Sequence, residues 1–286
     1  MKKLIITSLI LLLLIGSSTQ ALSSNKPIEF DVQILNEQTR VDFTHTVFAE
    51  ETTATWCPNC PMAAEALYNI YQSGEYDFYY VALVDDMNPI AKARNIEFTF
   101  LSKVYAFPTV YFDGGDANFV GRGSSVFATE AEYRPLIEQV GQRTPKQPLT
   151  LETSATWDGN AQITITITAT NEGSLPYLGI LRSYVTEIIS RWIDNDGNPY
   201  HYALLDYAIN QYVLLMPNKP KTFSVNFDGN ADHQGQTYED ITQENIQIVT
   251  TLSNWIPHFR TGYESTQYNQ YYFARYVDQT NATIPI

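Results

Sequence analysis

The chain has only two cysteines among its 286 residues, Cys57 and Cys60, and they lie three positions apart. Structural disulfides in exported proteins usually join distant segments, because closing a long loop restricts the unfolded chain most. A bond between these two cysteines closes almost no loop and adds little stability. The pair therefore indicates redox chemistry, with an inert disulfide or half of a zinc site as the alternatives.

Histidine is scarce as well. A structural zinc site needs four ligands, and the only nitrogen ligands available are His45, His201, His233 and His258. None of these lies at ligand spacing from another. We therefore expect no metal site, and no bound cofactor beyond the two sulfurs.

Positive charge is also in short supply, with 17 Lys and Arg against 31 Asp and Glu and a formal net charge of −14. Such a surface repels nucleic acid and anionic lipid. The composition therefore argues against nucleic acid as a partner.

No apolar run reaches the roughly 20 residues that a membrane-spanning helix requires. The longest, Leu4–Ile15, follows Lys2 and Lys3 and precedes small or polar residues up to Ala21. This order is typical of a signal peptide over residues 1–21, with an uncleaved anchor as the alternative. We expect export to the periplasm, the cell surface or the medium.

What is present is enough apolar material for real cores, 44% of the chain, of which much is aromatic. Residues 22–40 are predicted to form an N-terminal arm. Residues 41–143 then alternate strand and helix patterns, which predicts an α/β domain of ordinary size. The expected order is strand 41–50, helix 58–72, strand 78–84, helix 89–104, hairpin 109–112 and 117–121, and helix 130–142.

Residues 144–148 carry two prolines and are predicted to be a linker. Beyond them Ile163, Ile165 and Ile167 alternate with threonines, as in a half-buried strand. Similar patterns and regularly spaced turns predict an antiparallel β-sandwich over 149–262, followed by a polar, tyrosine-rich tail over 263–286. The turn Asp194-Asn195-Asp196-Gly197 resembles part of a calcium loop, but a hairpin turn explains it more simply.

The cysteine motif lies between a predicted strand and a predicted helix. Cys57 is thus expected at a helix N-terminus, where the helix dipole lowers a thiol pKa from about 8.5 into roughly the 3.5–7.5 range. Cys60 would resolve a mixed disulfide formed by Cys57, and Pro58 suits the first helical position. Glu51 lies six residues before Cys57 and is the candidate buried proton acceptor, whereas Glu50 points the other way.

A second motif, Ala106-Phe107-Pro108-Thr109, precedes a predicted strand. A cis bond before Pro108 is plausible there, and it would place the backbone of Phe107 beside the sulfurs to pair with a substrate strand. Trp56 and Phe107 are the candidate substrate-binding residues.

These motifs together resemble the thioredoxin superfamily over roughly residues 38–143: Trp-Cys-x-x-Cys after a strand, an acid six positions earlier, and Phe-Pro-Thr about fifty residues later. The resemblance implies that Cys57 is the nucleophile, Cys60 the resolving thiol, Pro108 the cis-proline and Glu51 the buried acid. The chain departs from thioredoxin in having Glu instead of Asp at that position and Pro61 directly after the second cysteine.

The wider stretch Glu50–Pro61 looks like the Omp-twenty-eight-like branch of exported thioredoxin-fold proteins. So does Ser190-Arg191-Trp192 followed by residues 196–202, which extends the resemblance into the second half of the chain. This resemblance implies no activity for the second half of the chain.

The expectation is an exported thiol–disulfide oxidoreductase acting on protein thiols or disulfides. A membrane-bound electron donor or acceptor is a further possible partner. The sequence does not determine the direction of electron flow, the role of the second half or the oligomeric state. The alternatives are a surface binding protein on a redox-inert thioredoxin scaffold and a metallochaperone.

Overall fold

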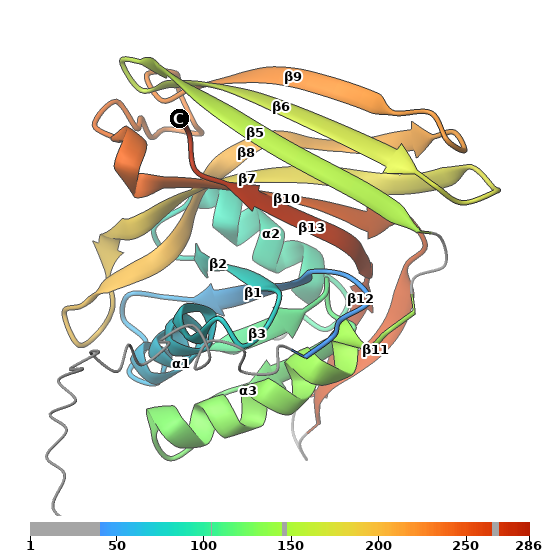
Figure 1. Ribbon diagram of the computed structural model, residues 1–286. Helices are drawn as coiled ribbons and strands as arrows, with labels where there is room; N and C mark the ends of the chain where they lie inside the picture. The colour runs from blue at the N-terminus through green and yellow to red at the C-terminus, as the bar shows by residue number, and fades with distance from the viewer. Residues whose placement is uncertain (1–40, 104, 145–147, 265–268) are drawn as a thin grey trace, which may run out of the picture. The chain divides into compact units, whose positions relative to one another are not determined.

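The computed structural model describes residues 41–103, 105–144, 148–264 and 269–286 (Figure 1). The predicted signal peptide (1–21), all of the predicted arm (22–40) and most of the predicted linker lie outside these residues. No helix in the described ranges is both long and apolar enough to cross a membrane.

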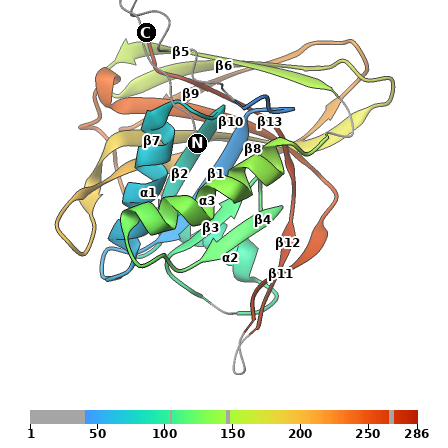
Figure 2. The same ribbon diagram turned by 60° about the horizontal axis from the view of Figure 1, so that its bottom comes forward.

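The first half of the chain builds a layer of strands with helices on both faces. Its elements are β1 (Val47–Thr53), α1 (Cys60–Ser73), β2 (Phe78–Val84), α2 (Pro89–Thr99), β3 (Thr109–Phe112), β4 (Ala117–Val120) and α3 (Val126–Gly141). β1 pairs in parallel with β2 and antiparallel with β3. Helices α1 and α3 lie on one face of these strands and α2 on the other (Figure 2). The predicted glycine-turn hairpin 109–121 and the end of α1 at Gly74 are confirmed.

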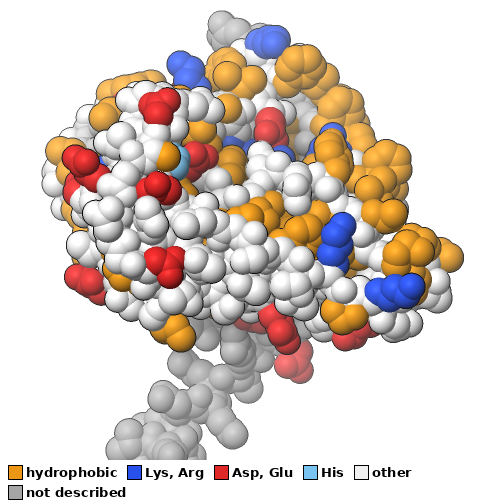
Figure 3. All heavy atoms as spheres, turned by 90° about the horizontal axis from the view of Figure 1, so that it is seen from above, with side chains coloured by type: hydrophobic (Ala, Val, Ile, Leu, Met, Phe, Trp, Pro, Cys, Tyr) orange, Lys and Arg blue, Asp and Glu red, His pale blue; other side chains and the backbone are white. Residues whose placement is uncertain are grey.

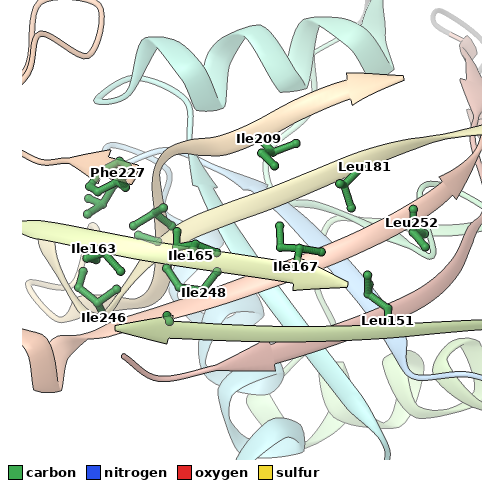
Figure 4. Close-up of a cluster of buried hydrophobic side chains, with 14 of the residues drawn as sticks. Leu151, Ile163, Ile165, Ile167, Leu181, Ile209, Phe227, Ile246, Ile248 and Leu252 are labelled. Carbon is green, nitrogen blue, oxygen red and sulfur yellow. The ribbon is translucent and has the colours of Figure 1, made fainter. Parts of the chain in front are cut away.

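The second half is made of strands. They are β5 (Leu149–Gly159), β6 (Gln162–Asn171), β7 (Tyr177–Ile193), β8 (Pro199–Leu215), β9 (Lys221–Asp228), β10 (Ile246–Asn254), β11 (His258–Glu264), β12 (Asn269–Ala274) and β13 (Val277–Thr283), with a short 3-10 helix at Gln243–Asn245. The alternation predicted for β6 is confirmed, since every second residue is buried. β5, β6 and β9 form an antiparallel sheet over β7, β8 and β10, and the isoleucines of β6 fill the space between (Figure 4).

The predicted fold class, an α/β thioredoxin fold followed by an all-β antiparallel sandwich, is wrong. One eight-stranded mixed sheet runs through both halves in the order β13-β10-β7-β8-β2-β1-β3-β4. About 48% of the described residues are strand and about 19% helix, so the protein is mostly β. The junction is between β2 and β8, which pair in parallel at Ala82 and Ala203.

The fold class was predicted wrongly because the hydrophobic pattern of a segment indicates that it is a strand but not which strand lies beside it. The apolar run 78–84 was predicted to be a central strand buried on both faces, and β2 is buried on both. Its second neighbour is β8, more than one hundred residues later, and β8 lacks a regular apolar alternation. Residues 263–286, predicted to be a polar tail, contribute β12 and β13, and β13 is an edge strand of the large sheet.

A buried ion pair and a hydrogen bond join β1 and β7 of this sheet to helix α2. Arg94 on α2 donates from Nε and Nη2 to the two carboxylate oxygens of Glu50 on β1, at 2.8 and 2.7 Å. The hydroxyl of Tyr184 on β7 donates to the same carboxylate at 3.0 Å. Glu50 therefore faces α2, away from α1, as the sequence predicted.

Removing this charge should weaken the fold. We expect Glu50→Gln to lower the free energy of unfolding by about 3 kcal/mol, because it leaves the buried Arg94 without its principal counter-charge. Glu97→Gln is the matched control, since Glu97 also binds Arg94 but is half-exposed, and it should cost less than about 1 kcal/mol. Urea unfolding measures both values, and equal effects of the two changes would contradict the argument.

Candidate functional site

The two cysteines form a disulfide, with their Cα atoms 5.4 Å apart. Both sit in a small apolar cluster with Ala54, against which Phe107 packs. Cys57 is 2% exposed and Cys60 fully buried. The bond expected from the three-residue spacing is therefore present, beneath the surface.

The position of Cys57 relative to the helix differs from the prediction. Helix α1 begins at Cys60, not at residue 58, with Asn59 as its N-cap and Pro61 in the first turn. Pro61 therefore occupies the kind of position predicted for Pro58, where a missing N–H costs nothing, and it does not interrupt the helix. Cys57 lies in the turn before α1, and its carbonyl accepts the N–H of Cys60 at 3.3 Å.

The second motif lies beside the disulfide. The Phe107–Pro108 bond is cis, as expected, and β3 follows it directly. The ring of Phe107 meets the indole of Trp56 edge-on, with centroids 5.9 Å apart. Trp56 is 62% exposed, so the two aromatic residues predicted to bind substrate lie next to each other at the covered disulfide.

Glu51 is a buried acid on the face of β1 that α1 and α3 cover. Alternation along the strand puts it on the same face as Val47 and Ala49, which pack against α1 and α3. Its side chain is fully buried, and neither carboxylate oxygen has a hydrogen-bond partner among the described residues. Burial, followed by the negative charge of Asp194, raises the pKa of Glu51 from 4.5 to about 8. Glu51 is therefore mostly protonated at neutral pH.

Two tyrosines share this environment. The hydroxyls of Tyr80 on β2 and Tyr133 on α3 are buried and have no hydrogen-bond partner in the described part of the chain. Burial and the nearby Glu51 raise the pKa of both phenols well above 10. A carboxyl and two phenols thus lie in an apolar space where charge is costly.

Sequence reasoning missed several side chains that shape the site. The guanidinium of Arg122 donates to the side chain of Asn59, between the cysteines, at 3.0 Å. Asp86 accepts the backbone N–H and the hydroxyl of Thr55 at 3.0 and 2.5 Å, which holds the turn before Trp56. No motif marks these residues, because each is far from the cysteines along the chain.

A separate cavity of about 490 Å³ lies away from the cysteines. Its walls include aromatic rings and three guanidinium groups, two of which, those of Arg94 and Arg182, form ion pairs with Glu97. The lining comes from α2, β7, β8 and β12 and includes Arg94, Arg182, Arg275, Phe100, Tyr212 and Phe273.

No protein-family model and no curated protein matches the sequence. Among solved structures, HBP35 of Porphyromonas gingivalis matches with a TM-score of 0.60 and 14% identity, over 85% of this chain and 76% of that one. Protein AGR_C_4864 from Agrobacterium tumefaciens matches with a TM-score of 0.46 and 13% identity, over 85% of this chain and 95% of that one. The likeness to HBP35 shows a shared fold and nothing of its activity. It fits a thioredoxin-like arrangement of the first half within the larger sheet.

Proposed function

We propose that this protein is a thiol–disulfide oxidoreductase that acts on protein thiols or disulfides through Cys57 and Cys60. The observation that carries the proposal is the disulfide itself: the two cysteines are bonded, flank the start of α1 and pack against Phe107 of the cis-proline loop. A bond that closes so short a loop gains little as a staple. Its chemistry is the better reason for its presence.

The exchange proceeds in two balanced steps. In the reduced protein, the Cys57 thiolate attacks one sulfur of a substrate disulfide, which forms a mixed disulfide and releases one substrate thiolate. Cys60 then loses its proton and attacks the Cys57 sulfur, which forms the internal disulfide and releases the second substrate thiolate. Two electrons pass to the substrate. The same steps in reverse oxidise a substrate dithiol.

Glu51 is proposed to handle the proton of Cys60. It lies on the face of β1 that α1 covers, and Cys60 is the first residue of α1. When the internal disulfide is opened, protonated Glu51 gives its proton to the departing Cys60 thiolate; in the opposite direction its carboxylate accepts that proton. A pKa near 8 suits both directions at neutral pH.

Substrate would enter past Trp56 and Phe107. Because Cys57 is 2% exposed, a substrate sulfur has to displace part of this aromatic cover before it can react. The cover then supplies apolar contact to the substrate chain, and the backbone of Phe107 offers an edge for strand pairing. We further propose that residues 1–21 direct export and that a membrane-bound partner exchanges electrons with the cysteine pair.

The rival function is binding on a redox-inert scaffold. The burial of Cys57 favours it, as does the cavity lined by Arg94, Arg182 and Arg275. From above, the centre of the surface is largely neutral and polar, with hydrophobic side chains gathered along the right-hand side (Figure 3). Surfaces of this kind often contact partners.

Thiol trapping separates the two functions. The protein is reduced with dithiothreitol, separated from the reductant and treated with iodoacetamide between pH 5 and 10. We expect Cys57 to be alkylated with an apparent pKa below the value of about 8.5 for a free thiol, and Cys60 to react much more slowly because it is fully buried. Peptide mass spectrometry assigns the label. A disulfide that resists the dithiol, together with an unreactive Cys57, would favour binding.

A further inference from the structure

The cavity between α2, β7, β8 and β12 has a volume of about 490 Å³, within the range of roughly 300–1,000 Å³ that small-molecule sites have. Helix α2 covers one face of the large sheet (Figure 1), and its Ile90 packs in one cluster with Leu83 of β2 and Leu204 of β8. The cavity lies at the C-terminal end of this helix, where Glu97 meets Arg182 of β7. Both halves of the chain are therefore needed to form it.

One carboxylate is already bound at this cavity. Oε2 of Glu97 accepts hydrogen bonds from Nη1 of Arg94 at 2.5 Å and from Nη2 of Arg182 at 2.9 Å. Both guanidinium groups are buried, whereas the side chain of Glu97 is half-exposed. Burial raises the pKa of Glu97, but the charges of Arg94, Arg182 and Arg275 outweigh this and lower it overall. The surroundings of Glu97 therefore favour negative charge.

The positive charges at the cavity exceed the negative ones. Among the described residues, the three guanidinium groups of the lining face two carboxylates, that of Glu97 and that of Glu50 behind Arg94. The excess falls on Arg275, whose Nη1 donates to a neutral group, the carbonyl of Trp255. The chain as a whole carries a net charge of −14, so this excess is a local feature. It favours an anionic ligand.

Aromatic rings form the exposed side of the cavity. Phe100, Tyr212 and Phe273 belong to its lining and are 61%, 63% and 44% exposed. Large apolar groups gathered at one exposed place mark a contact site. Nζ of Lys103 lies 4.6 Å from the ring centroid of Phe100 and adds positive charge there. A ligand that contacts these rings needs an apolar body as well as a negative charge.

We propose that this cavity binds a small aromatic carboxylate. The negative group of the ligand pairs with Arg275 beside Arg182, and its ring packs among the three exposed aromatic side chains. The lining and the cysteine cluster consist of different residues, so this binding is independent of thiol–disulfide exchange.

Isothermal titration calorimetry with two matched probes tests the role of charge. The first probe, 1-naphthylacetate, carries a ring and a carboxylate, and the second, 1-naphthylacetamide, is its neutral isostere. We expect the oxidised full chain to bind the carboxylate about tenfold more tightly than the amide, because hydrogen bonds between charged groups are the stronger ones. Equal affinities, or no binding of the carboxylate at millimolar concentration, would overturn the proposal.

Arg275→Gln locates the binding site. The variant loses the excess charge but keeps a side-chain N–H for the carbonyl of Trp255. We expect its affinity for 1-naphthylacetate to fall about tenfold, to that of the amide, and its affinity for the amide to stay unchanged. The matched control is Arg134→Gln on α3, which removes a guanidinium paired with Glu75 and Glu130 outside the cavity and should alter neither affinity.

Phe273→Ala tests the aromatic side of the cavity and does not depend on the charge variant. It removes a half-exposed ring, and we expect it to weaken both probes by the same factor, a few-fold, because each loses the same ring contact. Circular dichroism confirms that each variant is folded. Wild-type affinity for 1-naphthylacetate in folded Arg275→Gln, or in folded Phe273→Ala, would place the ligand elsewhere and refute the site.

Discussion

We expect Cys60→Ser to trap a mixed disulfide between Cys57 and a substrate, whereas Cys57→Ser abolishes exchange. In the first variant the nucleophile remains but nothing resolves the intermediate, since the chain holds only two cysteines. In the second no nucleophile remains in the turn before α1. Insulin reduction with dithiothreitol as electron source should fall at least about 10³-fold in the second, because the step loses its covalent catalyst.

The trap is seen as a shifted band on a non-reducing gel after the reduced variants are mixed with an unfolded protein that carries disulfides. The band should disappear on treatment with reductant and be absent in Cys57→Ser, which is the matched control. Equal trapping by the two variants would show that the roles of the two sulfurs are not distinct. Absence of trapping by either would leave the binding function as the explanation of the fold.

The second large effect concerns stability. The pKa of Glu51 is 4.5 in the unfolded state and about 8 in the folded state. We expect the wild-type protein to lose stability as the pH rises between these two values, and Glu51→Gln to abolish this loss. The folded state holds the proton more tightly, so its advantage is complete below pH 4.5 and is lost as pH rises through 8. Each pH unit in this window costs about 1.4 kcal/mol, so the whole difference is on the order of 5 kcal/mol.

Urea unfolding of the oxidised protein at pH 5, 7 and 9 measures this difference. The stability of Glu51→Gln relative to wild type should increase with pH across the window and level off above it. Glu50→Gln is the matched control, because Glu50 is equally buried but paired with Arg94; it should lower stability without reproducing this rise. A wild-type curve parallel to that of Glu51→Gln would contradict the raised pKa.

Local features of the sequence predicted much of the site. The three-residue spacing of the cysteines predicted their disulfide, Phe-Pro-Thr predicted the cis bond at Pro108, and the position of Glu51 six residues before Cys57 predicted a buried acid. The start of α1 was wrong by two residues. Asn59 is the N-cap and Pro61 lies in the first turn, and only the fold decides at which of these neighbouring residues the helix begins.

The pairing of strands could not be predicted from periodicity. An apolar run such as β2 states that both faces are buried, but not which strand lies beside it. The pairing of Ala82 with Ala203, and hence one continuous mixed sheet in place of a separate thioredoxin fold and sandwich, results from tertiary packing.

The sequence by itself determined the disulfide pair, the buried acid and the cis-proline loop, because all three depend on residues close together in the chain. Only the tertiary structure decided the surroundings that give them their properties: the hydroxyl of Thr53 donates to Tyr200 across 147 positions, and the burial that raises the pKa of Glu51 results from the packing of strands and helices around β1. A side chain's pKa depends on what surrounds it in space, and spacing along the chain does not contain that information.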